Sequence, residues 1–120
     1  MASRNTLTSA LPYTSYVSGT VTGDATTPTL SNLSGISSAD TGCVSIARTG
    51  MGDYNISVTN FRGAKGNLKG FGTATTISNM ISCTAQAFTA STDTAVFTFK
   101  VESDASTAVD NGFNFILLAD

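Results

Sequence analysis

Apolar and polar residues alternate along most of the chain with the two-residue period of a β-strand. The clearest alternation is Phe97, Phe99 and Val101, and Tyr54 and Ile56 follow the same period before Val58. Helical spacing of apolar residues is almost absent, which predicts an all-β protein. The segments that we expect to form strands are 16–22, 44–46, 54–58, 68–75, 77–88, 97–101 and 113–119.

Glycine-containing turns separate several of these segments. Segment 49–53 reads Thr-Gly-Met-Gly-Asp, and segments 64–67 and 110–112 are further turn signals. The glycines inside segment 68–75 predict a bulge or a close approach of backbone. Short strands joined by such turns favour an antiparallel β-sandwich of jelly-roll type with about seven or eight strands. An immunoglobulin-like sandwich is the alternative, although the chain has no tryptophan.

A length of 120 residues predicts a single domain. Residues 1–12 lack strand alternation and hold Leu7, Leu11 and Pro12 among polar residues. We interpret them as an extended N-terminal arm that orders on a partner, and a frayed terminus is the alternative. The β-sandwich domain is then expected to span residues 13–120.

Few residues are charged, and this narrows the choice of partners. Charged residues make up 12% of the chain, the net charge is -2, and serine and threonine fill 35 positions. The basic residues form no stripe that would neutralise phosphates, so we expect no nucleic-acid partner. No apolar run approaches the length of a membrane span, so we expect no membrane partner. A polar but weakly repulsive surface suits a protein that lies against copies of itself or a neighbour.

The residue types do not indicate an enzyme. The chain has no histidine, which excludes a Ser-His-Asp or Cys-His arrangement. We expect no catalytic residue, cofactor or metal. The acidic residues are interpreted as turn formers, with a calcium ion between Glu102, Asp104 and Asp110 as the alternative.

Cys43 and Cys83 are the only cysteines. Cys83 falls in the apolar register of its expected strand, which predicts a buried small hydrophobic residue. A disulfide with Cys43 is the alternative.

Three segments resemble a known family of proteins. Segment 44–58 reads Val-Ser-Ile-Ala-Arg-Thr-Gly-Met-Gly-Asp-Tyr-Asn-Ile-Ser-Val. It is similar to a hairpin that recurs in the β-sandwich virion proteins of tailed bacteriophages, and segments 97–101 and 113–115 resemble the last strands of such domains. The resemblance is greatest to capsid decoration (cement) proteins. It transfers no functional residue.

The resemblance implies a structural protein on the capsid surface of a virion, made in the host cytoplasm. Its partners would be the major capsid protein and further copies of itself, most simply as a homotrimer. A receptor- or glycan-binding module of a phage fibre or tail is the alternative. Positions 1–6 show no apolar core of a secretion signal.

The expected partner-binding residues are apolar or aromatic side chains in and beside the arm, where they can serve as anchors. They are Leu7, Leu11, Tyr13 and Tyr16. For Tyr13 and Tyr16, packing in the core or on a strand face is the alternative.

Overall fold

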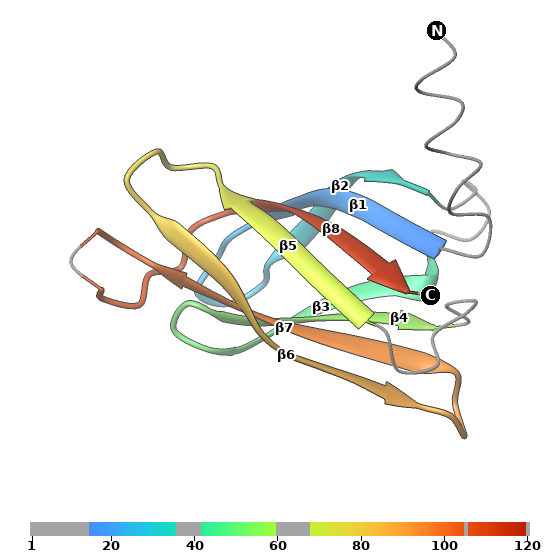
Figure 1. Ribbon diagram of the computed structural model, residues 1–120. Helices are drawn as coiled ribbons and strands as arrows, with labels where there is room; N and C mark the ends of the chain where they lie inside the picture. The colour runs from blue at the N-terminus through green and yellow to red at the C-terminus, as the bar shows by residue number, and fades with distance from the viewer. Residues whose placement is uncertain (1–14, 36–41, 60–67, 105, 120) are drawn as a thin grey trace, which may run out of the picture.

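The computed structural model describes residues 15–35, 42–59, 68–104 and 106–119. These residues contain eight strands, which Figure 1 shows as two layers. The strands are β1 (Ser15–Thr22), β2 (Thr29–Ser34), β3 (Val44–Gly50), β4 (Asp53–Thr59), β5 (Leu68–Ala74), β6 (Met80–Thr89), β7 (Thr94–Glu102) and β8 (Phe113–Ala119). None of the described residues forms a helix long and apolar enough to cross a membrane.

Each layer is a four-stranded antiparallel sheet. The β1/β8 sheet has the order β2-β1-β8-β5, and the β4/β7 sheet has the order β3-β4-β7-β6. The all-β, antiparallel prediction is confirmed. The jelly-roll connectivity is not confirmed, since β1–β2, β3–β4 and β6–β7 each join sequence neighbours within one sheet.

The core lies between the two sheets and is built from the alternating positions of their strands. In β7 every second residue is buried, which is the period that the sequence predicted. Phe113 stands near the centre, with ring centroids 5.2 Å from Phe99, 5.9 Å from Tyr54 and 6.4 Å from Phe115. The largest fully buried side chains are Tyr54, Phe97, Phe99, Phe113, Ile56, Leu117, Val17, Val21, Val58 and Val101.

The turn between β3 and β4 lies where the glycines of segment 49–53 predicted it. Gly52 has a φ of 73°, and a Cβ at this position would lie 2.5 Å from the carbonyl oxygen of Val101. Only glycine adopts this positive φ without strain and also leaves room for the carbonyl oxygen. The turn therefore packs tightly against the end of β7, and Val101 N donates a 2.8 Å hydrogen bond to Gly52 O.

The two sheets converge where β5 passes β6. A Cβ on Gly70 would lie 2.8 Å from Cys83 Sγ, and one on Gly72 would lie 3.1 Å from Ile81 Cδ1. The glycines of β5 therefore mark a close approach of side chains from β6, whereas the sequence predicted a bulge or a close approach of backbone. Cys43 and Cys83 are both free and half-buried, so the structure contains no bridge between them.

One expected strand started too early, and one strand was missed. β6 begins at Met80 rather than Ile77, because residues 75–79 turn from one sheet to the other, with Asn79 N bonded to Thr76 O. β2 was not predicted at all. Its two leucines, Leu30 and Leu33, break the period of two, because the β1–β2 register shifts and Asn32 adopts a φ of 53°.

Candidate functional site

Within the described residues no set of three or more histidine, cysteine, aspartate or glutamate residues could hold a metal ion. Two other features of these residues are candidates for a functional site. One is a polar network around Asp110, and the other is an apolar area on the outer face of the β1/β8 sheet.

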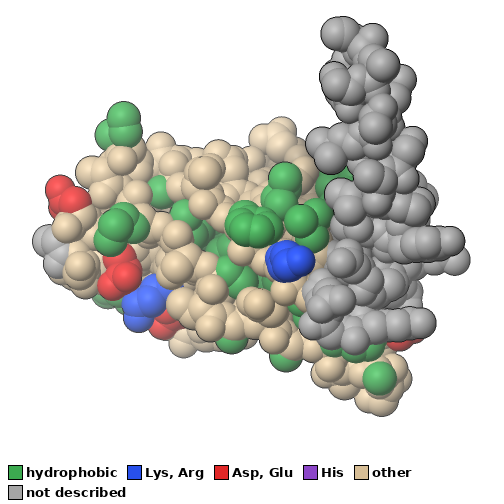
Figure 2. Space-filling view, viewed as in Figure 1, with side chains coloured by type: hydrophobic (Ala, Val, Ile, Leu, Met, Phe, Trp, Pro, Cys, Tyr) green, Lys and Arg blue, Asp and Glu red, His purple; other side chains and the backbone are tan. Residues whose placement is uncertain are grey.

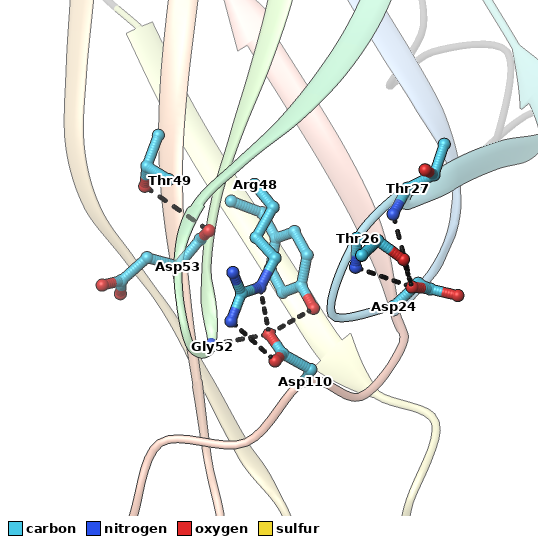
Figure 3. A network of polar contacts seen from close by, with 9 residues as sticks. Asp24, Thr26, Thr27, Arg48, Thr49, Gly52, Asp53 and Asp110 are labelled. Atoms are coloured by element: carbon cyan, nitrogen blue, oxygen red, sulfur yellow. Dashed lines mark hydrogen bonds and ion pairs between the residues drawn. The ribbon is translucent and has the colours of Figure 1, made fainter.

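Asp110 accepts four hydrogen bonds (Figure 3). Arg48 Nε and Nη2 donate to its two carboxylate oxygens at 3.0 Å each, and Gly52 N and the Tyr54 hydroxyl each donate to Oδ1 at 2.9 Å. Arg48 lies on β3 and Tyr54 on β4, whereas Asp110 precedes β8. The network therefore fastens the β7–β8 connection to the β3–β4 hairpin.

The charges of this network are strongly stabilised. The hydrogen bonds from Arg48 lower the pKa of Asp110 to about 2, helped by the bonds from Gly52 and Tyr54. Burial, together with the bond to Asp110, raises the pKa of Tyr54 to about 12. A carboxylate so occupied has little capacity to move protons or bind a cation. We interpret this network as a structural clasp, in which Asp110 does not act as a calcium ligand.

The clasp predicts a pH dependence of stability. Because the pKa of Asp110 is about 2 in the folded state and 3.8 as its ordinary value, its stabilising effect is present above about pH 4 and is lost as the pH falls toward 2. Discounted for water that reaches the carboxylate, the loss is roughly 1–2 kcal/mol. Urea unfolding at pH 5 and at pH 2.5 should show a smaller acid-induced loss in Asp110→Ala than in the wild type. An equal loss in both would contradict this assignment.

The outer face of the β1/β8 sheet carries apolar side chains in adjacent rows. Antiparallel pairing places Tyr16 beside Leu118 and Leu118 beside Lys69, and in the next row it places Ile116 beside Phe71. Directly paired side chains in a sheet lie about 5 Å apart, so these residues form one surface. We call Tyr16, Phe71, Ile116 and Leu118 the outer apolar cluster.

Most of this cluster is open to solvent. Tyr16 is 49% exposed, Phe71 55% and Ile116 43%, and Leu118 is half-buried. Figure 2 shows hydrophobic side chains gathered around a basic one on the face formed by β5 and β8. A shallow hollow of about 410 Å³ lies here, lined by Phe71, Gly72, Thr73, Asn114, Phe115 and Ile116. Contiguous exposed apolar surface of this kind marks interaction sites.

One charge accompanies the cluster. Lys69 is the only charged residue among the described outward positions of β1, β5 and β8, where its neighbours are serine, threonine, asparagine and the cluster itself. Thr20 Oγ1 donates a 2.7 Å hydrogen bond to Asn114 Oδ1 and so continues the face beyond the cluster. The centre of this outer face is thus mainly apolar, with one lysine beside it and serine and threonine side chains around it.

The outer face of the β4/β7 sheet differs in character. Its paired rows present mainly small, polar or charged side chains, with Val96 among them, and Thr98 Oγ1 donates a 2.9 Å bond to Asn55 Oδ1. Met80, at one end of β6, is the exposed large apolar side chain that the structure describes on this face. The two faces of the sandwich are therefore chemically distinct, and the β1/β8 face is the one suited to binding.

The predicted partner-binding residues are only partly described. Tyr16 belongs to the outer apolar cluster, where it is exposed rather than packed in the core. Leu7, Leu11 and Tyr13, and with them the arm of residues 1–12, lie outside the described residues and stay predictions. The sequence analysis missed Phe71, Ile116 and Leu118. Their outward positions in segments 68–75 and 113–119 were the available signal.

No family model, curated protein or solved structure matched the chain in comparisons with known proteins.

Proposed function

We propose that this protein is a structural, non-enzymatic virion protein that decorates and stabilises a bacteriophage capsid by binding the shell of the major capsid protein. The observation that carries the proposal is the outer apolar cluster on one face of the sandwich, whose other face carries mainly small or polar side chains. Such two-sided chemistry suits a protein that lies with one face on an assembly and the other toward solvent.

The chemistry of the cluster indicates what its partner offers. Phe71 and Ile116 lie on the outer face of one sheet and line a shallow hollow, so we expect a partner surface that is broad and apolar at its centre. Lys69 at the edge favours a carboxylate on the partner. The aromatic side chains Tyr16 and Phe71 are the anchors from which most of the binding energy is expected.

Repetition compensates for the modest size of this surface. A shell presents the same binding surface many times, and an oligomer that engages several copies gains avidity without new contacts. In this proposal Leu7, Leu11 and Tyr13 extend the contact that begins at Tyr16.

Electron-microscopic images of particles assembled with and without the protein test the proposal. The shells should be built from the major capsid protein of the genome that encodes the chain. We expect additional density on the faces of the shell only when the protein is present. Density confined to a tail or fibre would overturn the proposal in favour of an adsorption module, and the absence of added density would overturn both.

A further inference from the structure

The edge strands of the two sheets are protected to different degrees. An edge strand presents unpaired backbone N–H and C=O groups, and proteins guard such edges with charges, prolines or bulges. β3 carries the inward-facing Arg48 and β5 carries Lys69, while β2 follows Pro28 and is interrupted at Asn32. β6, Met80–Thr89, holds no charged residue and no proline.

β6 does contain one irregularity, which divides it into two parts. The β6–β7 register shifts between Cys83 and Ala85, and Thr84 Oγ1 donates to Thr98 O. Before the shift, β6 packs on β5 through Ile81 and Cys83. After it, residues 85–89 pair regularly with β7, and Figure 1 shows β6 continuing away from β5.

The second part of β6 is open. Residues 84–87 are all exposed and Phe88 is half-buried. Pairing places Gln86 opposite the buried Phe97 and Phe88 opposite the buried Ala95, so both lie on the inner side of the sheet. Ala85 and Ala87 then lie on the outer side. The edge formed by residues 85–89 is therefore uncharged, pairs regularly with β7 and carries small residues on its outer side.

We propose that residues 85–89 of β6 pair antiparallel with the same residues of a second copy of this chain. This pairing joins the two β4/β7 sheets into one continuous sheet related by a two-fold axis. A register centred on Ala87 sets Ala87 opposite its own copy and Gln86 opposite Phe88. The inward-facing residues of both strands then lie on one face of the joined sheet and the outward-facing residues on the other, as the side-chain alternation of a continuous sheet requires.

The chemistry of β6 favours a copy of itself as the occupant. β6 carries no charged residue, so two copies of the strand can pair without bringing like charges together. The contact is isologous and closes on itself as a dimer, the commonest symmetric assembly. It uses a different surface from the outer apolar cluster and does not rest on the proposed function. It replaces the three-fold assembly that the resemblance implies.

The mass of the full chain in solution tests this proposal. Light scattering after size exclusion, at increasing concentration, should reach twice 12.3 kDa for the wild type. The double variant Ala85→Lys/Ala87→Lys places like charges along the shared edge and should weaken the dimer at least about tenfold. The matched control Ser45→Lys/Ala47→Lys lies on the same outer face but on β3, and should remain dimeric.

Hydrogen exchange gives a second measurement, which uses only the wild-type protein and so does not depend on the folding of a variant. Amide exchange in residues 85–89 should slow as concentration rises, while β3 amides stay unchanged. A strict monomer at every concentration, a trimer, equal effects of the two double variants, or exchange in residues 85–89 that ignores concentration would each overturn the proposal.

Discussion

Replacing Asp110 with alanine is expected to lower the free energy of unfolding by about 2 to 3 kcal/mol. The change removes the acceptor for Arg48, for Gly52 N and for the Tyr54 hydroxyl at once. Tyr54 is fully buried, so water does not readily replace the lost partner. Urea unfolding at neutral pH, with an unchanged denaturant slope, measures the effect.

A matched substitution separates the clasp from a general effect of removing an acidic residue. Asp53 lies 4.0 Å from Lys100 with both side chains about 40% exposed, and surface pairs of this kind contribute little. Asp53→Ala should therefore change the stability by less than about 0.5 kcal/mol. Equal losses in Asp110→Ala and Asp53→Ala would contradict the structural role of the clasp.

Replacing Gly70 with valine is expected to cost about 2 to 3 kcal/mol, because the convergence of β5 and β6 leaves no room for a side chain. A Cβ at this position would lie 2.8 Å from Cys83 Sγ and 3.2 Å from ring atoms of Phe97 and Phe99. The two rings are fully buried and hold the centre of the core, so they cannot move aside without disturbing it. The fall in melting temperature relative to the wild type measures the loss.

Gly42→Val is the control for this change. A Cβ on Gly42 would meet no described atom within 4 Å, so the same substitution should be close to neutral there. If Gly70→Val were no more destabilising than Gly42→Val, the close packing of β5 on β6 would not limit stability.

The strands were predictable where one face of each strand is buried. Phe97, Phe99 and Val101 alternate with polar residues because a sheet has a buried and a solvent-facing side, and this period is visible in the sequence alone. The glycines of β5 were informative for a similar reason, since a missing side chain inside a strand signals a close neighbour. β2 escaped prediction because the bulge at Asn32 breaks its period.

The outer apolar cluster and the clasp depend on pairings between distant parts of the chain. Arg48 and Asp110 are 62 positions apart, and no sequence motif around either residue predicts that the two form an ion pair. Ile116 sits in an apolar run whose letters alone do not separate inner from outer positions, and in β8 Phe115 and Leu117 lie inside and Ile116 outside. That Ile116 meets Phe71 becomes visible only once β5 is known to pair with β8.

Co-sedimentation with empty capsid shells is the most direct test that the outer apolar cluster is a docking surface. Shells of the major capsid protein from the same genome would be mixed with the wild type, with Phe71→Ser/Ile116→Ser and with Ile77→Ser. Ile77 is a fully exposed isoleucine in the connection between β5 and β6, away from the cluster, and provides the control. Circular dichroism would show that all three are folded.

We expect the wild type and Ile77→Ser to bind the shells alike. We expect Phe71→Ser/Ile116→Ser to bind at least about tenfold more weakly, because two central apolar contacts are lost. Shell binding by the double variant at the wild-type level, with its fold intact, would show that the outer apolar cluster does not dock on the shell.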